Sequence, residues 1–222
     1  MKIFYENTDV CIIEKPVGIP CESASGEECV TDILKKEKNT EIFLLHRLDR
    51  NVGGVMIFAK NKKSAAFLQN EMQNGVFKKE YLAVTDGIPQ EKNGVYEDLL
   101  FKDSKKNRSF VVKSMRKGVK KASLEYEVIG EKDGKALVKV LLHTGRTHQI
   151  RVQFSSRGTP LCGDGKYGSH DNASKNISLN AAFLTVKIPG GEVFRFSSFP
   201  DTSVYPWNIF KERIDELSKT TD

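Results

Sequence analysis

The 222-residue chain is long enough to bury a substantial core, and its 39% hydrophobic and 29% charged residues, with a net charge of +6, are typical of a globular protein. No apolar run approaches the length of about 18 residues that a membrane-spanning helix requires, and the N-terminus lacks the apolar stretch of a signal peptide. These features exclude a helical membrane protein and predict a protein of the cytoplasm.

The first part of the chain is predicted to alternate short strands and helices. The run GGVMIFAK at 53–60 is continuously apolar, which is typical of a strand buried on both faces. In the segment after it, Ala65, Leu68 and Met72 fall on one face of a helix. The strands expected in this part are 9–16, 53–60 and 76–87, and the helices are 29–38 and 62–75.

The second part of the chain favours strands that pair in hairpins. In 122–130 apolar and acidic residues alternate, and Asp133-Gly134 is a suitable turn before the next apolar run. Spacing then predicts a helix over 146–158, and a last helix with Pro206 in its first turn. Few helices between hairpins predict an α+β fold on a mixed, mostly antiparallel sheet. The strands expected here are 122–130, 135–145, 178–188 and 192–197, and the last helix packs through Trp207, Phe210, Ile214 and Leu217.

The four cysteines do not form a recognisable metal or redox motif. No two of them have C-x-x-C spacing, so neither a zinc knuckle nor a redox pair is indicated. Buried thiols without a chemical role are the expected state of Cys11, Cys21, Cys29 and Cys162.

A strip at 102–121 concentrates the positive charge of the chain. It holds nine Lys or Arg residues against one Asp, so the rest of the chain is close to neutral. Such a strip indicates a polyanionic partner. A lysine-rich hairpin that is only solvated would have the same composition, and this reading stays open.

The segment HRLDRNVGGV at 46–55 places one aspartate between two arginines. Neighbouring cations favour the ionised form of Asp49 if they are close in space, and an ionised carboxylate on a turn can act as a nucleophile or base. A structural ion pair is the alternative.

The segment HTGRTHQIR at 143–151 is a candidate anion site. Thr144 or Thr147 could cap a helix whose N-terminus carries Arg146 and His148, and amides at a helix N-terminus suit phosphate. A basic surface helix is the alternative. His143 and His148 straddle a glycine, which makes a metal site unfavourable.

No phosphate-binding loop, dinucleotide-binding fingerprint or nucleophile elbow is present, and no metal-binding triad is apparent. We therefore expect chemistry that uses neither a nucleotide cofactor nor a metal.

Four segments in this order resemble the RluA-type pseudouridine synthases. They are CIIEKPVGIP, HRLDRNVGGVMIFAKN, KKEYLAVTDG and LLHTGRTHQIRVQFSSRGTPLCGDGKYG, and the resemblance covers about residues 3–199. It implies a mixed, mostly antiparallel sheet with a catalytic cleft across it, and isomerisation of uridine to pseudouridine in structured ribosomal or transfer RNA, without cofactor or metal.

The resemblance also implies roles for individual residues. Asp49 corresponds to the essential aspartate, Tyr81 to the tyrosine that packs against the target base, and Arg151 to the basic residue that pairs with the aspartate. Arg47 corresponds to the arginine that fills the gap left by a flipped nucleotide in some members, and Arg50 could hold a phosphate or the carboxylate. The residues expected to bind RNA are Arg47, Arg50, Arg146, His148 and Gln149.

This chain departs from the family pattern at three places. Val52-Gly53-Gly54 replaces Thr-Ser-Gly, Glu14 replaces an Asn, and Gln153 replaces a His. We expect residues 1–222 to form one catalytic domain without an S4-type RNA-binding domain, and to act as a monomer. There are two alternatives. One is an inactive relative that serves as an RNA chaperone or assembly factor, and the other is a hydrolase that uses Asp49 on a glycosidic bond.

Overall fold

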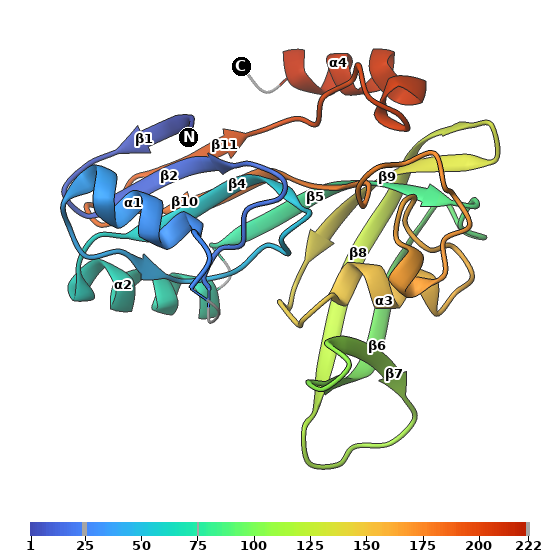
Figure 1. The fold of residues 1–222 in the computed structure, drawn as a ribbon, viewed down its shortest axis with the longest axis horizontal. Helices are drawn as coiled ribbons and strands as arrows, with labels where there is room; N and C mark the ends of the chain where they lie inside the picture. Colours follow the sequence, from blue (N-terminus) through green and yellow to red (C-terminus); the bar gives the residue numbers. More distant parts are fainter. Residues whose placement is uncertain (24–25, 75, 221–222) are drawn as a thin grey trace. The chain divides into compact units, whose positions relative to one another are not determined.

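The computed structural model divides into two compact units, shown as a ribbon in Figure 1. Unit 1 comprises Met1–Lys79 and Asn180–Pro200, and unit 2 comprises Glu80–Leu179 and Asp201–Asp222. The single catalytic domain expected from the sequence stays a prediction. The residues that the structure describes are 1–23, 26–74 and 76–220.

The strands of unit 1 follow the order β1-β2-β4-β10, with β11 paired to β10 and β3 paired to β4. All pairs are antiparallel except β4 with β10, which is parallel. These strands are β1 (Ile3–Glu6), β2 (Val10–Lys15), β3 (Phe43–Leu44), β4 (Gly53–Ala59), β10 (Leu179–Lys187) and β11 (Val193–Ser197).

Helices α1 (Val30–Lys38) and α2 (Lys62–Gln73) belong to unit 1 and confirm the two helices predicted there. The side chain of Asn61 caps α2 by accepting a hydrogen bond from the amide of Ser64 at 2.8 Å. All residues of β4 are buried, as its continuous apolar run predicts. The core of unit 1 joins apolar side chains of β2, β4, α2 and β10, among them Ile12, Ile57, Leu68 and Leu184.

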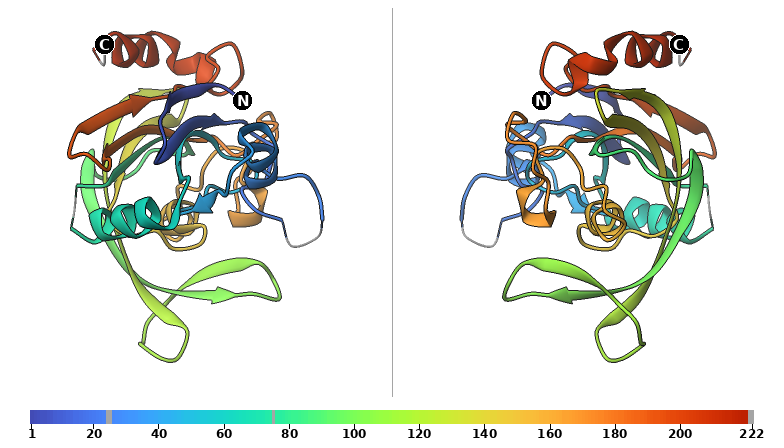
Figure 2. Two further views of the ribbon diagram at one scale, coloured as in Figure 1. Left: turned by 90° about the vertical axis from the view of Figure 1, so that its left-hand side faces the viewer. Right: turned by 90° about the vertical axis from the view of Figure 1, so that its right-hand side faces the viewer.

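The strands of unit 2 follow the order β5-β9-β8-β6-β7. The β6–β7 hairpin extends away from the rest of this unit (Figures 1 and 2). The strands are β5 (Lys78–Asp86), β6 (Asn93–Asp103), β7 (Arg108–Val112), β8 (Val119–Lys132) and β9 (Lys135–Leu142), and the helices are α3 (Gln149–Ser155) and α4 (Lys211–Lys219) with two single 3₁₀ turns, η1 (Gly165–Tyr167) and η2 (Trp207–Phe210).

The α+β class with a mostly antiparallel sheet is confirmed, and so is the hairpin at Asp133-Gly134, whose φ angles are +54° and +71°. Four of the described strands were not predicted, namely β1, β3, β6 and β7. The last helix differs from expectation, because Trp207–Phe210 form a 3₁₀ turn before α4 begins.

All four cysteines are free and buried, as expected. Within the described ranges, no helix combines the length and the apolar character needed to cross a membrane.

Candidate active site

Asp49 lies on a turn between β3 and β4 in unit 1. Its carbonyl oxygen accepts a hydrogen bond from the amide of Val52 at 3.0 Å, and the amide of Gly18 donates to the carbonyl of Arg50 at 2.8 Å. The side chain of Asp49 is half-buried, and that of Arg50 is exposed. The backbone of Asp49 and Arg50 is therefore fixed by hydrogen bonds, while Asp49 as a whole stays half-buried.

Lys15, at the end of β2, binds this turn from the buried side. Its side chain exposes 1% of its surface, and its ammonium donates to the carbonyls of Pro16 at 2.8 Å, Arg50 at 3.1 Å and Val52 at 2.9 Å. Burial lowers the pKa of Lys15 to about 8, although the charge of Asp49 opposes this effect. Three acceptors for three N–H donors satisfy a buried charge that would otherwise be costly.

Gly54 explains why the motif ends in a glycine. Its φ is +121°, and a Cβ atom built there would lie 2.3 Å from the carbonyl oxygen of Ala181, its partner in the parallel β4–β10 pair. Only glycine tolerates both the backbone angle and this approach. The close pairing fixes the start of β4 directly after the Asp49 turn.

The departures from the family pattern are accommodated inside each unit. Val52 is buried, and its carbonyl accepts a hydrogen bond from the ammonium of Lys15. Glu14 accepts a hydrogen bond from the hydroxyl of Ser198 at 2.7 Å. In unit 2, the amide nitrogen of Gln153 donates to the carbonyl of Tyr96 at 3.0 Å and to Asp98 at 2.7 Å.

His46, the first residue of the H-R-L-D motif, is a half-buried residue with a neutral ring. Both ring nitrogens are buried without a hydrogen-bond partner in the described part of the chain. Burial, with a smaller contribution from the charge of Lys79, lowers the pKa of His46 to about 3. The ring packs edge-on against Phe77, with 5.6 Å between centroids.

The two arginines beside Asp49 point to the surface of unit 1, where each meets a glutamate. Arg47 pairs with Glu22 at 2.7 Å, and Arg50 pairs with Glu27. Both pairs join the Asp49 turn to the segment that precedes α1.

In unit 2, Arg151 forms a buried two-pronged ion pair. Its Nε donates to Oδ2 of Asp164 at 2.6 Å, and its Nη2 donates to Oδ1 at 2.9 Å. The two side chains expose 6% and 1% of their surface. This geometry fixes the plane of the guanidinium group and neutralises its charge in a site with little water.

Tyr167 connects this pair to the β6–β7 hairpin. Its hydroxyl accepts a hydrogen bond from the amide of Ser109 at 2.8 Å and lies 2.9 Å from Nδ1 of His148. The guanidinium groups of Arg108 and Arg151 each lie 5.0 Å from the centre of its ring. Burial raises the pKa of Tyr167, so the ring serves as a neutral packing surface.

The predicted cap of the 146–158 helix is wrong. The helix has seven residues, Gln149–Ser155, and His148 occupies the N-cap position in the left-handed region without a side-chain cap. Thr144 instead donates to the amide oxygen of Gln149 at 2.7 Å. The four-residue spacing of Ile150 and Phe154 located the helix, but it could not show that the preceding loop would be closed by a glutamine.

Gln149 is held entirely by neighbours in unit 2. Its amide oxygen also accepts from the backbone amide of Arg146 at 3.0 Å, and its amide nitrogen donates to the carbonyl of Ser123 at 3.0 Å. The Nε of Arg146 donates to the carbonyl of Lys121 at 2.9 Å. These bonds hold the loop before α3 against the first half of β8.

Tyr81 lies in the middle of β5 and exposes 5% of its surface. A tyrosine in a core and a tyrosine in the wall of a site can both have such low exposure. Its stacking role therefore stays a prediction.

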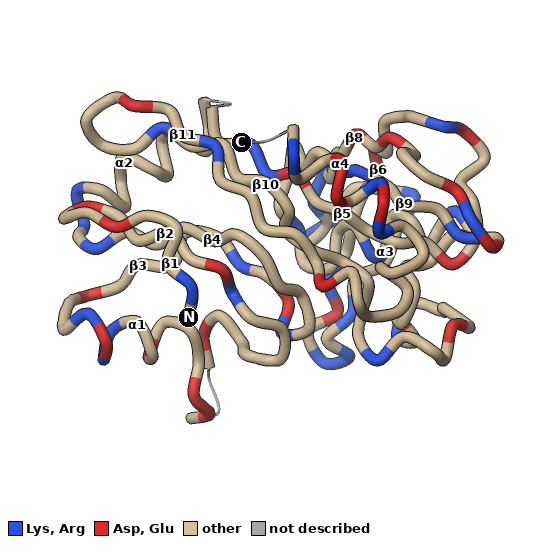
Figure 3. The backbone as a smooth tube through the Cα atoms, turned by 90° about the horizontal axis from the view of Figure 1, so that it is seen from above, with Lys and Arg blue, Asp and Glu red and all other residues tan. Residues whose placement is uncertain are grey.

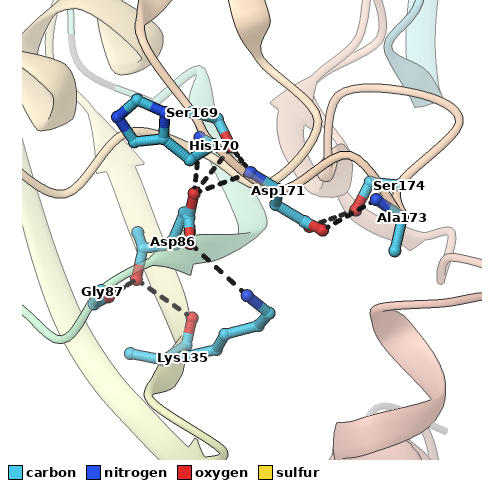
Figure 4. Close-up of polar contacts among 10 residues, drawn as sticks. Asp86, Gly87, Lys135, Ser169, His170, Asp171, Ala173 and Ser174 are labelled. Carbon is cyan, nitrogen blue, oxygen red and sulfur yellow. Dashed lines mark hydrogen bonds and ion pairs between the residues drawn. The ribbon is translucent and has the colours of Figure 1, made fainter.

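Asp86, at the end of β5, holds the loop that follows Tyr167 (Figure 4). Its carboxylate accepts hydrogen bonds from the hydroxyl of Ser169 at 2.9 Å and from the amides of His170 at 2.9 Å and Asp171 at 3.1 Å, and it lies 3.4 Å from the ammonium of Lys135. Burial opposes ionisation, but these four donors together lower the pKa of Asp86. The segment between α3 and β10 is therefore held at two places, by the Arg151–Asp164 pair and by the contacts of Asp86.

Sequence reasoning selected Asp49 and Arg151 but assigned no role to Lys15, Asp164 or Tyr167. All three lie inside the segments CIIEKP and GDGKYG on which the resemblance rests. A buried lysine cannot be distinguished from a surface lysine by its residue type, because its acceptors are carbonyls that any residue provides.

The basic strip 102–121 forms the end of β6, all of β7 and the start of β8. All of its Lys and Arg side chains are exposed except that of Arg108, which is half-buried. Elsewhere on the chain, acidic and basic residues are interspersed (Figure 3). The strip is therefore a solvent-facing hairpin with a surplus of positive charge.

The family model for RNA pseudouridylate synthase matches residues 9–156. An uncharacterised RNA pseudouridine synthase of Zymomonas mobilis is 32% identical over 92% of this chain and 93% of its own length. Ribosomal large subunit pseudouridine synthase C of Buchnera aphidicola is 34% identical over 82% of this chain and 60% of its own. Human RNA pseudouridylate synthase domain containing 4 has the same fold, with a TM-score of 0.76 at 24% identity, over 96% of this chain and 93% of its own.

Proposed function

Because this chain belongs to the RNA pseudouridylate synthase family, in its RluA-type branch, we propose that it converts uridine to pseudouridine in structured ribosomal or transfer RNA with Asp49 as the catalytic carboxylate. Enzymes of this family are isomerases that act on RNA. The reaction breaks the bond between N1 of the base and C1′ of the sugar, rotates the base, and joins C5 to C1′. A proton leaves C5 and the freed N1 takes up a proton, so substrate and product have the same composition and the reaction requires no electron carrier and no energy source.

The observation that carries this proposal is the construction of the Asp49 turn. Lys15 binds the carbonyls of Arg50 and Val52 from the core, and Gly54 locks the following strand. A carboxylate that must reach one atom of a substrate has to be held to within about half an ångström. The hydrogen-bonded backbone around the half-buried Asp49 supports such a role.

Roles for unit 2 follow from its internal contacts together with the family resemblance. Arg151 is proposed to orient Asp49, while its own Nε and Nη2 donate to Asp164. Tyr81 is proposed to stack against the target base. We propose a positioning role for Gln149 in place of RNA contact, because its amide atoms bind other parts of unit 2.

Binding of RNA is proposed to use Arg47, Arg50, Arg146, His148 and the basic strip 102–121. Enzymes that react with a base inside a folded nucleic acid first move that base out of its stack, and Arg47 can then fill the vacancy. The exposed lysines of the strip supply contacts to phosphates that do not depend on sequence. We further propose that the protein acts in the cytoplasm as a monomer.

The proposal is tested with RNA that carries tritium at C5 of uridine. Ribosomal and transfer RNA transcripts, which lack modifications, are the substrates. Wild-type protein should release tritium, and Asp49→Asn should release none while it binds RNA with similar affinity. Glu41→Gln, an exposed carboxylate of the same unit, is the matched control and should retain activity. Release of tritium by Asp49→Asn, or free uracil as the product, would contradict the assignment.

A further inference from the structure

The segment between β2 and α1 places a carboxylate on each arginine beside Asp49. Glu22 accepts from Nη1 of Arg47 at 2.7 Å, and Glu27 pairs with Nη2 of Arg50. The Asp49 turn therefore presents two neutralised cations, not two bare ones, when no RNA is bound.

These two glutamates contribute little to the fold. The side chains of Glu22 and Glu27 expose 54% and 42% of their surface, and their arginine partners expose 55% and 51%. Ion pairs this exposed are weak. Other contacts hold the ends of the segment, such as those of Cys21, whose thiol lies 3.2 Å from the carbonyl of Leu48 and whose own carbonyl accepts from the amide of Thr31.

We propose that Glu22 and Glu27 compete with RNA phosphates for Arg47 and Arg50, so that RNA binds by replacing them and the two glutamates restrict which RNAs can bind. This inference rests on the proposed function, which assigns both arginines to RNA. It adds two specificity-determining residues that lie outside the chemistry itself.

The physical reason is that RNA must break the two arginine–glutamate ion pairs to bind. Only an RNA that makes enough other contacts gains the free energy to offset this loss. A phosphate at one arginine must break an existing ion pair, which reduces its gain by a factor of about 1.4 to 5. An RNA that engages both arginines and inserts its target base gains enough other contacts to offset two such factors. An unrelated strand, bound only by charge, does not.

The exchange also has a signature in salt dependence. Each phosphate neutralised on a single strand contributes about 0.7 to the slope of log affinity against log salt concentration. In the wild type, the phosphate is neutralised by the arginine, but the glutamate that the arginine leaves becomes an unpaired negative charge. The net number of charges neutralised on binding is therefore smaller, and so is the slope. Removing the glutamate charge restores the full contribution, so the slope should steepen by up to about 0.7 for each arginine.

The test uses the full chain and a labelled oligoadenylate, which contains no uridine. The double variant Glu22→Gln/Glu27→Gln is compared with Glu28→Gln, a matched change in the same segment at an exposed residue that forms no ion pair within the described ranges. Affinity is measured over roughly 50 to 200 mM salt. The double variant should bind about 2- to 25-fold more tightly at the lowest salt with a steeper slope, and Glu28→Gln should change the slope little.

A second measurement addresses selectivity. Excess oligoadenylate should inhibit tritium release from ribosomal RNA more strongly in the double variant than in Glu28→Gln. Equal slopes in the two variants, or no tightening in the double variant, would overturn the exchange. If the wild type released no tritium from any RNA, the proposed function would fail, while the binding measurements would still decide whether Glu22 and Glu27 compete with phosphate.

Discussion

The buried pair of Arg151 and Asp164 offers the sharpest test of how the site is built. Replacing Asp164 by Asn keeps the shape but removes the negative charge that pairs with a guanidinium group that is 6% exposed. Breaking a buried ion pair from one side costs about 3 to 5 kcal/mol. For a chain of this size, 1 kcal/mol corresponds to about 2 to 4 °C in melting temperature. Asp164→Asn should therefore melt roughly 6 to 20 °C below wild type.

The measurement is thermal unfolding followed by circular dichroism, with Asp215→Asn as the matched control. Asp215 pairs with Lys211 on the surface of α4, where the side chains expose 43% and 59% of their area. An exposed pair contributes at most about 1 kcal/mol, so this control should lose no more than about 4 °C. Equal losses in the two variants would refute the inference that burial makes the Arg151–Asp164 pair important.

A double variant then separates stability from activity. Arg151→Met with Asp164→Leu replaces the pair by apolar side chains, which commonly restores the stability that the single change removes. We expect its melting temperature to recover at least half of the loss, while tritium release is abolished because Arg151 is gone. Tritium release at the wild-type level in this double variant would show that Arg151 only supports the fold, and would remove it from the proposed chemistry.

Two further predictions concern unit 1. Gly54→Ala should lower the free energy of unfolding by about 3 kcal/mol or more, because its Cβ would overlap the backbone of Ala181. Chemical denaturation measures this loss. The control is Gly134→Ala, where φ is also positive but the added Cβ meets no atom within 4 Å. The pKa of Lys15, about 8 in the fold and 10.5 ordinarily, means that the folded state loses this proton first, so the stability of wild type relative to Lys15→Met should rise by about 2 to 3 kcal/mol from pH 7 to pH 10. A difference that does not change with pH would contradict the burial of that charge.

The elements predicted well are those whose pattern is local and whose environment is uniform. The strand at Gly53–Ala59 is buried along its whole length, so a continuous apolar run identified it. The β8–β9 hairpin depends on Asp133-Gly134, two residues that accept positive φ angles at little cost. In both, the determining residues lie within a few positions of the structure that they specify.

The elements missed depend on contacts that no periodic pattern in the sequence records. Strand β7 has only five residues, in a strip whose charge dominates its composition, and it is defined by pairing with β6 and by the bond from Ser109 to Tyr167. The loop before α3 is closed by Gln149, which reaches Thr144 and Ser123. Neither contact leaves a periodic signal in the sequence.

The same distinction applies to the candidate site. A carboxylate between two arginines was visible at Asp49, but the sequence could not show that both arginines face glutamates from another segment. Nor could it show that Lys15, 34 positions before Asp49, holds the turn from the core. The residue proposed to react could be identified from the sequence because a carboxylate between two arginines is an unusual arrangement. The residues that hold it could not, because a lysine bound to carbonyls and a lysine in water differ only in the fold around them.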